Sequence, residues 1–422
     1  MKVYIKTYGC TLNQADGDLM ASILANNNVD ISENADDADV VVLNTCTVKK
    51  PTEQRTLHVL KSLRENGKNV VVAGCMAGSR RDAIERIFPN AGILTTDNVQ
   101  HIYDAVESTH AGKKIVFDSA ARSDKLMLFN ANNNVVARVP VNDGCLSSCS
   151  FCETKYARGP LNSFSEQLIL KAVENSVRNG AKEIQITSQD IGAYGADRKT
   201  NIAMLMQKIS KIEGDFRVRI GMLNPEHLGR YLDAFTESMN DNVFYKFVHL
   251  PVQSGSNRIL GQMKRRYTAE QFCEYVRALR SMIPGVAIET DVIVGYPTES
   301  LSDFDRTLDL IKEVKPDVTN VSKFCTRPHA AASRFKMINN TEMSRRSLQL
   351  SRLVRSIQKE INSRFVGQRI NALMTEYTGR SVNGRSPSYK QVVLPGADAN
   401  LGEYRVTDIH AASANVLYGN LT

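Results

Sequence analysis

The chain has 422 residues, which is too long for one ordinary hydrophobic core, so two or three domains are expected. Hydrophobic residues make up 42% and charged residues 23%, and no apolar run approaches the roughly 20 residues of a membrane-spanning helix, so we expect no membrane partner. The formal net charge of +8 is compatible with a polyanionic partner without establishing one. The first residues, MKVYIKTYGC, lack the apolar segment of a secretory signal, and we expect a cytoplasmic protein.

Residues 1–112 alternate short β-branched runs with helical patterns such as 13–26 and 51–66. This alternation predicts a flavodoxin-like α/β domain with an open parallel sheet. The expected strands are KVYIKTYG, VVVLNTC, NVVVAGC and GILTTD.

Three cysteines follow the first three of these strands. Cys10, Cys46 and Cys75 each stand at the carboxyl end of one strand. Because parallel strands end at one edge of a sheet, and ligands bind at that edge in doubly wound folds, the three thiols can share a site. The residues alone leave two interpretations open, a metal site and three small buried thiols.

Residues 113–134 lose the periodicity and gain charge and asparagine, which predicts a linker. A second βα series follows in residues 135–365. Its six strand–helix units predict a partial (β/α)6 barrel rather than a complete eight-fold barrel. The expected strands are VVARVPVND, EIQITSQD, RVRIGML, VFYKFVHLPVQ, VAIETDVIVGYP and DVTNVSKFC.

The run DGCLSSCSFCETKYARG, just after the first of these strands, holds Cys145, Cys149 and Cys152. A C-x3-C-x2-C triplet is one thiolate short of the four that normally hold a four-iron four-sulfur cluster. One iron would therefore stay open to a ligand that is not protein, which indicates chemistry at this site. The alternatives are a zinc site, which lacks a nearby fourth ligand, and disulfides.

The last part of the chain has features that favour binding of a polyanion. Residues 342–365 predict one long basic helix, whose cations either contact nucleic acid or form a solvated face. Residues 366–422 carry about five short β-rich pieces between turns, which predicts a small all-β barrel of a kind often used on nucleic acid. The candidate phosphate-binding cations of the helix are Arg345, Arg346, Arg352, Arg355, Lys359 and Arg364.

The triplet, with Phe151 before its last cysteine, resembles that of the radical S-adenosylmethionine (SAM) enzymes. The resemblance implies that the three thiolates hold a 4Fe-4S cluster and that the amino and carboxylate groups of SAM chelate the open iron. An electron from the cluster then splits SAM into methionine and a 5′-deoxyadenosyl radical. Phe151 is expected to pack on or near the adenine of SAM.

The runs TYGCTLNQADG, NTCTVKKPTEQR and AGCMAG resemble the three N-terminal cysteine motifs of methylthiotransferases. By this resemblance Cys10, Cys46 and Cys75 hold a second, auxiliary 4Fe-4S cluster. The C-terminal segment resembles a TRAM domain, which such enzymes use to grip tRNA.

The barrel motifs GCLSSCSFCETKYARG, TSQDIGAYG, RIGMLNPEHL, HLPVQSGSN and ETDVIVGYPTES are most similar to the archaeal and eukaryotic branch of that family. That branch acts on N6-threonylcarbamoyladenosine at tRNA position 37. The alternatives are a methylthiotransferase for isopentenyladenosine or for a ribosomal-protein aspartate, and a non-catalytic iron–sulfur protein that binds RNA.

Several barrel residues at or near strand ends are expected to bind SAM. Asp190 is the candidate partner of the SAM amino group, or else a helix N-cap. Arg219 is the candidate partner of the SAM carboxylate, or else a surface strand charge. The full set is Ser188, Gln189, Asp190, Arg219, Gln253, Ser254, Asp291 and Gly295. Cys273 is expected to be buried in a helix, and Cys325 is left without a role.

The family resemblance also implies a mechanism. One SAM methylates a sulfur attached to the auxiliary cluster, and a second SAM yields the radical that removes the hydrogen from adenine C2. Both clusters must then face one cavity, so the linker has to bring the N-terminal cysteines over the barrel mouth. The expected partners are the tRNA anticodon stem-loop, whose modified base leaves its stack, and an external flavodoxin- or ferredoxin-like electron donor.

Overall fold

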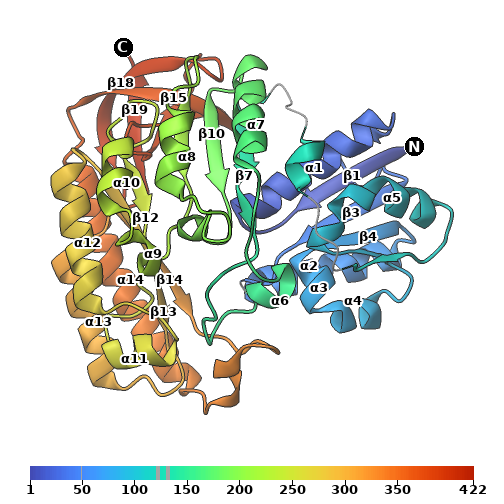
Figure 1. Ribbon diagram of the computed structural model, residues 1–422, viewed down its shortest axis with the longest axis horizontal. Coiled ribbons are helices and arrows are strands. Elements are labelled where there is room, and N and C mark those ends of the chain that lie inside the picture. Colours follow the sequence, from blue (N-terminus) through green and yellow to red (C-terminus); the bar gives the residue numbers. More distant parts are fainter. Residues whose placement is uncertain (49, 120–123, 130–133) are drawn as a thin grey trace.

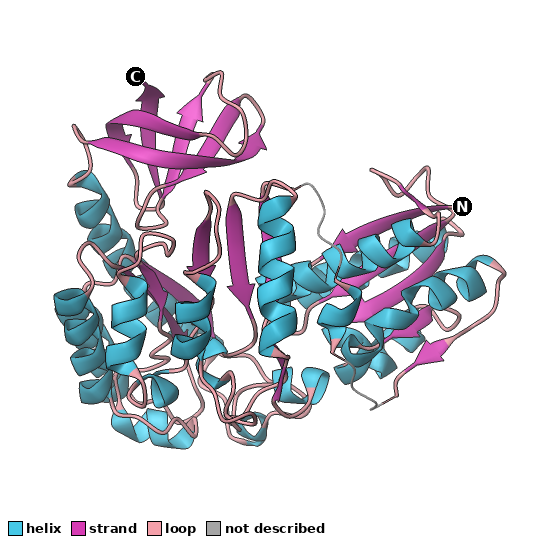
Figure 2. Cartoon of the chain, turned by 45° about the horizontal axis from the view of Figure 1, so that its top comes forward, coloured by secondary structure: helices cyan, strands magenta, loops and turns pink. Residues whose placement is uncertain are grey.

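The computed structural model describes residues 1–48, 50–119, 124–129 and 134–422, and Figure 1 shows three regions along the chain. The N-terminal region lies beside a central partial barrel, and a small β-barrel sits at one end of the central strands (Figure 2). Residues 120–123 and 130–133 of the predicted linker lie outside the described residues. None of the helices in the described ranges is long and apolar enough to cross a membrane.

The N-terminal region is a parallel sheet of six strands with helices on both faces, as the sequence predicts. The strand VVVLNT is buried along its whole length, which is typical of a parallel sheet covered on both sides. The sheet order is β2-β1-β3-β4-β5-β6. The strands are β1 (Lys2–Thr7), β2 (Asp30–Ile31), β3 (Val40–Thr45), β4 (Asn69–Gly74), β5 (Gly92–Leu94) and β6 (Val116–Phe117). The helices are α1 (Thr11–Asn26), α2 (Lys50–Glu65), α3 (Cys75–Ser79), α4 (Arg81–Ile87), η1 (Thr96–His101) and α5 (Ile102–His110).

The segment predicted as a linker is more structured than expected. Its residues 116–117 form β6, which pairs with β5 and extends the N-terminal sheet. A short helical turn, η2 (Lys125–Leu128), buries the side chains of Lys125 and Leu126. The sequence does not predict the buried turn because the stretch is polar, and the buried residue Lys125 is itself charged and has buried partners.

The central region contains the six predicted parallel strands in two sheets, β11-β10-β7 and β12-β13-β14, which an isolated bridge between Val218 and Phe244 connects. The edge strands β7 and β14 do not pair with each other in the described ranges, so the barrel is partial. The strands are β7 (Val136–Pro140), β10 (Glu183–Thr187), β11 (Arg217–Ile220), β12 (Phe247–His249), β13 (Ala287–Val294) and β14 (Val318–Lys323). The main helices are α7 (Glu166–Arg178), α8 (Ile202–Ile209), α10 (Leu232–Met239), α12 (Ala269–Met282), α13 (Leu301–Val314) and α14 (Asn340–Ser363).

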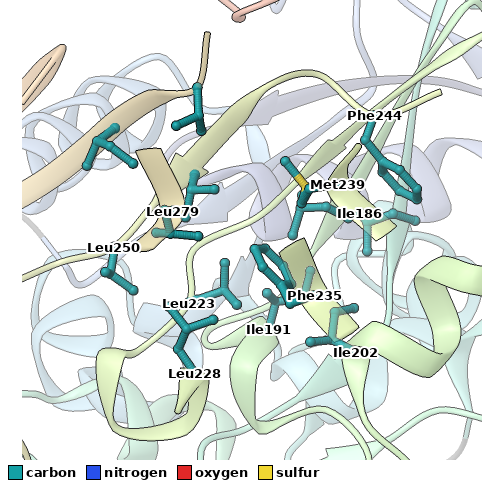
Figure 3. Close-up of a cluster of buried hydrophobic side chains, with 14 of the residues drawn as sticks. Ile186, Ile191, Ile202, Leu223, Leu228, Phe235, Met239, Phe244, Leu250 and Leu279 are labelled. Carbon is teal, nitrogen blue, oxygen red and sulfur yellow. The ribbon is translucent and has the colours of Figure 1, made fainter. Parts of the chain in front are cut away.

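The helices of the barrel begin where their sequences supply caps. Thr268 and Gln271 form a capping box at the start of α12, and Ser300 and Asp303 form another at the start of α13. Apolar side chains from these helices and the strands form one large core, part of which Figure 3 shows. The core fixes the strands, and the loops after them are free to carry chemistry. The segments that connect the main strands and helices contain several short elements. They are β8 (Asn142–Asp143), α6 (Thr154–Arg158), β9 (Asn162–Ser163), η3 (Ile191–Ala193), α9 (Pro225–Leu228), α11 (Asn257–Gln262) and η4 (Ala331–Arg334).

The C-terminal region is a closed barrel of five strands, in the order β15-β16-β17-β19-β18, which confirms the predicted small all-β barrel. It lies against the amino-terminal ends of the central strands (Figure 1). Tyr389 donates a hydrogen bond of 2.9 Å to Glu183 at the start of β10, and Lys390 pairs with Asp317 just before β14 at 2.8 Å. The strands are β15 (Arg369–Thr378), β16 (Ser381–Arg385), β17 (Gln391–Pro395), β18 (Tyr404–Ala412) and β19 (Val416–Leu421).

Candidate active site

The cysteine triplet lies on the loop between β8 and α6, near the carboxyl end of β7. Gly144 before it has φ +72°, and a Cβ there would lie 1.9 Å from the carbonyl oxygen of Pro160, so only glycine fits. The amide of Cys145 donates to the carbonyl of Gly159 at 3.2 Å, which ties the two ends of the loop together. Cys145, Cys149 and Cys152 are all half-buried free thiols.

Hydrogen-bond donors point at the sulfur atoms of the triplet. The Arg265 guanidinium donates to Cys149 Sγ at 3.3 Å, and the amide of Thr154 donates to Cys152 Sγ at 3.3 Å. Burial raises the pKa of Cys145 to about 12, with the charge of Asp190 adding to it, and burial raises the pKa of Cys149 against the opposing charge of Arg265. The free thiols of Cys145 and Cys149 are therefore protonated, and coordination to iron would deprotonate them.

The N-terminal cysteines lie together, as predicted, because β1, β3 and β4 are neighbours in the sheet. Cys10 precedes α1, Cys46 follows β3 and Cys75 begins α3. Gly9 has φ +108°, and a Cβ on it would lie 2.6 Å from Cys46 Cβ, so this glycine lets the two cysteine segments meet. Burial, with smaller contributions from Cys46 and Cys10, raises the pKa of Cys75 to about 12.

All eight cysteines are free thiols. In the described parts of the chain, no group of three or more His, Cys, Asp or Glu side chains is compact enough to hold a single metal ion. Ligands of an iron–sulfur cluster bind separate iron atoms and stand farther apart than the ligands of one ion. Each set supplies three thiols, the donor type and number that suit a 4Fe-4S cluster with one open iron.

Arg158 joins the two cysteine sites. This residue ends α6, the helix directly after the triplet, and its side chain is 1% exposed. Its guanidinium lies 3.4 Å from Cys75 Sγ and donates to Asn13 Oδ1 at 2.6 Å. Thr96 Oγ1 also donates to the carbonyl of Ala157 at 3.0 Å. The segment that carries the triplet is therefore packed directly on the segment that carries Cys75.

Four buried charges surround this junction. Arg158 pairs with Asp16 at 2.6 Å and with Asp143 at 2.9 Å, and Lys125 pairs with the same carboxylates at 3.1 and 2.6 Å. Burial alone would lower the pKa of Lys125, but Asp143 and Asp16 outweigh it and raise that pKa. Burial would likewise raise the pKa of Asp143, but Lys125 and Arg158 lower it. The two cations and two carboxylates thus form one buried cluster of ion pairs.

A cavity of about 660 Å³ opens between the N-terminal region and the barrel. Thr47 and Val48, next to Cys46, form one wall, and Phe151 and Cys152 of the triplet loop form another. Cys325 also lines this cavity, whereas Cys273 is buried within α12. The N-terminal region and the triplet loop thus share one space, but Cys10, Cys46 and Cys75 are not among the described residues that line it, so a cavity common to both cysteine sets stays a prediction.

The residues at the end of β10 suit a polar ligand next to the triplet. Ser188 Oγ and Gln189 Oε1 are buried without a hydrogen-bond partner in the protein. Asp190 Oδ1 caps η3 by accepting from Gly192 at 3.1 Å, while Oδ2 lies 3.3 Å from His227 Nε2. Buried polar atoms without partners are costly, so this cluster fits the amino and hydroxyl groups of SAM.

Four further residues predicted to bind SAM lie in or after β12 and β13, and only two of them line the cavity. Gln253 and Asp291 line the 660 Å³ cavity, in keeping with the predicted contacts to SAM. Ser254 is buried and hydrogen-bonds to Thr307 and Ser256, so its hydroxyl is used inside the fold. The amide of Gly295 donates to Glu299, and a Cβ there would lie 2.5 Å from Met343. The Ser254 hydroxyl is thus used inside the fold and Met343 fills the space beside Gly295, while their contacts with SAM stay predictions.

Arg219 does not lie where a SAM carboxylate partner is expected. Its guanidinium lies 5.3 Å from the ring centroids of both Phe247 and Tyr389, and Tyr389 belongs to the C-terminal barrel. The side chain extends toward the amino-terminal end of the strands, since an inward-facing residue of a barrel strand can lean either way. The predicted role for Arg219 therefore requires correction.

The basic helix α14 is only partly available to a polyanion. Arg346 is buried and pairs with Glu299 at 2.9 Å and Glu342 at 2.7 Å, so its predicted contact with phosphate does not fit the structure. Arg345 and Arg364 are exposed but pair with Glu342 and Glu360. The exposed residues Arg352, Arg355 and Lys359 stay candidates.

Four residues of the site escaped the sequence reasoning. Arg158, Arg265 and Arg327 approach the cysteine segments, and Glu153 next to Cys152 is buried with both carboxylate oxygens unpartnered by hydrogen bonds. Burial raises the pKa of Glu153, which Arg327 opposes. Position was a signal for two of them, since Glu153 and Arg158 lie in the same motif as the triplet, whereas Arg265 and Arg327 stand far from any cysteine motif in the sequence.

Two family models match the chain. Residues 2–95 match the Uncharacterized protein family UPF0004, and residues 139–311 match the Radical SAM superfamily. Among solved structures, the radical S-adenosylmethionine methyltransferase TsrM from Kitasatospora setae, with cobalamin and a 4Fe-4S cluster bound, aligns with a TM-score of 0.56 at 12% identity. The alignment covers 79% of this chain and 77% of that one, and it shows the fold alone.

Curated relatives match along the whole chain. A probable threonylcarbamoyladenosine tRNA methylthiotransferase of Archaeoglobus fulgidus is 41% identical, over 100% of this chain and 99% of its own length. Its counterpart in Pyrococcus abyssi is 39% identical with the same coverage. The threonylcarbamoyladenosine tRNA methylthiotransferase of Homo sapiens is 32% identical over 99% of this chain and 73% of its own length. The chain therefore belongs to the threonylcarbamoyladenosine tRNA methylthiotransferase family and is a radical SAM methylthiotransferase that uses an iron–sulfur cluster and SAM.

Proposed function

We propose that this enzyme adds a methylthio group to C2 of N6-threonylcarbamoyladenosine at tRNA position 37, which gives 2-methylthio-N6-threonylcarbamoyladenosine. The observation that carries the proposal is the junction at Arg158, where the segment after the triplet packs on the segment that begins with Cys75. The substrate follows the names of the relatives, which match over the full chain.

The two cysteine sets would hold two 4Fe-4S clusters, Cys145, Cys149 and Cys152 one and Cys10, Cys46 and Cys75 the other. When bound, the first cluster would supply an electron for cleaving SAM to a carbon radical, and the second would supply a sulfur that carries the methyl group of another SAM. Arg265 and Arg158 would stabilise the thiolates by charge-assisted hydrogen bonds. Ser188, Gln189 and Asp190 would orient SAM, and Phe151 would cover its adenine.

The tRNA would approach with its anticodon stem-loop. Arg352, Arg355 and Lys359 on α14 and the C-terminal barrel supply the positive surface for its phosphates. The reaction would take place in the cytoplasm, with electrons from a flavodoxin- or ferredoxin-like donor. SAM would occupy the 660 Å³ cavity, which Cys152 lines on one side and Thr47, the residue after Cys46, lines on the other.

Nucleoside mass analysis of tRNA from cells that lack the gene tests the proposal. We expect threonylcarbamoyladenosine to persist and its 2-methylthio derivative to disappear, and re-expression of the chain restores it. If the derivative persists in the deletion strain, or if a methylthio group is lost from a different nucleoside or from a ribosomal protein instead, the proposed substrate is refuted.

A further inference from the structure

A second cavity, of about 730 Å³, lies where all three regions meet. Thr11 and Gln14 of α1 contribute one wall, and Thr11 directly follows Cys10 in the chain. Arg138 and Arg219 contribute from the central strands, and Arg385 and Tyr389 from the C-terminal barrel. The lining of this cavity differs from that of the first one, because it contains three arginines from two regions of the chain.

Two of these arginines have no anionic partner. Arg138 pairs with Asp18 at 2.9 Å, but neither Arg219 nor Arg385 forms an ion pair within the residues that the structure describes. Arg219 Nε is buried without a hydrogen-bond partner. Both guanidinium groups lie over Tyr389, at 5.3 and 4.8 Å from the ring centroid. The aromatic contacts hold the two cations in place without neutralising them.

In the described ranges, the two acidic residues that line this cavity, Glu183 and Glu376, form no ion pair with Arg219 or Arg385. Glu183 accepts hydrogen bonds from Gln185 at 2.7 Å, Tyr389 at 2.9 Å and Tyr245 at 3.0 Å, which occupy its oxygens. A partly buried, unpaired cation is costly, and a ligand with a carboxylate or phosphate would relieve that cost.

We propose that this cavity receives the group on N6 of the modified base and that Arg219, with Arg385, binds its carboxylate. The proposal rests on the proposed function, because a threonylcarbamoyl group ends in the free carboxylate of threonine. A guanidinium fork matches a carboxylate with two parallel hydrogen bonds. An isopentenyl group is uncharged and would leave both arginines unpaired, so the same cavity would select against isopentenyladenosine.

Binding of three anticodon stem-loop RNAs to the cluster-loaded enzyme tests this inference. The RNAs carry threonylcarbamoyladenosine, its methyl ester, or unmodified adenosine at position 37. We expect the native enzyme to bind the free acid about tenfold more tightly than the ester, the size of one charge-assisted hydrogen-bonded pair. Arg219→Met should reduce binding of the acid to that of the ester and leave the other two RNAs unchanged.

Two further variants keep the test decisive. Arg219→Met could disturb the packing on Tyr389, so Arg385→Met serves as an independent variant and should produce the same loss of discrimination between acid and ester. Arg86→Met, on the exposed face of α4, removes a guanidinium that pairs only at the surface with Asp82 at 2.7 Å and should change nothing. Equal binding of acid and ester by the native enzyme overturns the inference, as does uniform weakening of all three RNAs, which would place a backbone phosphate on Arg219.

Product formation tests the proposed function separately from this inference. If the native enzyme methylthiolates the threonylcarbamoyladenosine RNA while Arg219→Met and Arg385→Met still discriminate acid from ester, only the inference fails. If the native enzyme forms no methylthio product on that RNA under conditions where it cleaves SAM, the proposed function itself fails.

Discussion

The two cysteine sites of this enzyme are built in opposite ways. Cys10, Cys46 and Cys75 follow three neighbouring strands of a regular sheet, so the strand register brings them together, with Gly9 allowing the close approach of Cys10 and Cys46. The triplet at 145–152 stands on one irregular loop, which contacts around Gly144 and Arg265 hold in place. A sheet edge sets positions over long sequence distances, whereas a loop needs its neighbours to hold it. The comparison teaches that the loop is the site more sensitive to its surroundings.

The largest expected effect separates the roles of the two sites. Alanine at Cys10, Cys46 or Cys75 should abolish methylthiolation while cleavage of SAM to 5′-deoxyadenosine continues. Alanine at Cys145, Cys149 or Cys152 should abolish both reactions, because no open iron then remains for SAM. Quantifying 5′-deoxyadenosine and methylthio nucleoside in parallel checks this, with Cys273→Ala as the matched control. Survival of the methylthio product in the first set would show that the N-terminal thiols are structural.

The next effect concerns the group that joins the two sites. Arg158→Met should lower the free energy of unfolding by about 3–5 kcal/mol, because Asp16 and Asp143 keep only Lys125 as a cation. Denaturant unfolding measures this difference. Adding Asp16→Asn to Arg158→Met should recover part of the loss, since one buried carboxylate is then neutral.

The matched control for Arg158 is Arg277→Met, which removes an exposed arginine paired with Glu313 at 3.5 Å. It should change the free energy of unfolding by no more than about 0.5 kcal/mol. An equal effect of the two substitutions would mean that the buried charges do not hold the regions together.

A smaller effect is expected at the surface of α14. Replacing Arg352, Arg355 and Lys359 together with glutamine should weaken tRNA binding and reduce the slope of log affinity against log salt by about 0.9 for each lost phosphate contact. Filter binding at several salt concentrations measures the slope. Glutamine at Arg346 should instead lower stability, because that side chain pairs inside the protein. An unchanged slope in the triple variant would make the basic helix a solvated face.

The smallest effect is a pH dependence inside the barrel. Burial and the charge of Arg219 lower the pKa of His249. Its hydrogen bond to Asp291 at 2.9 Å and the charges of Asp291 and Glu289 raise it. The second set outweighs the first, so the pKa lies above 6.5. The charged pair therefore contributes stability below pH 6.5, and this contribution is lost as pH rises through the raised value. Asp291→Asn should flatten the difference in melting temperature between acidic and alkaline pH. A melting profile identical to that of the native enzyme would contradict the assigned pair.

Much of the fold follows from sequence periodicity. The six barrel strands and the helix 301–314 form where β-branched runs and amphipathic spacing predict them, because local pattern and burial agree there. The cysteine positions also follow, since each closes a predicted strand or lies in a compact motif. β2 and β6 have only two residues each, too few for a period to show.

The contacts between regions do not follow from the sequence. Lys125 sits in a polar stretch without periodicity, and its two carboxylate partners lie in α1 and β8. The orientation of Arg219 depends on Tyr389, a residue 170 positions later in another region. Side chains that pack between separately folding units have no local signal, so only the assembled structure reveals them.

The four buried charges at the junction have a consequence for how this enzyme can be rebuilt. Asp16, Lys125, Asp143 and Arg158 come from the N-terminal region, the connecting segment and both sides of the triplet. A chimera that takes its N-terminal region from a distant relative would inherit one member of the set without the other three. The enzyme is modular in its strands and helices but not at its centre, where exchange between relatives must move three segments together.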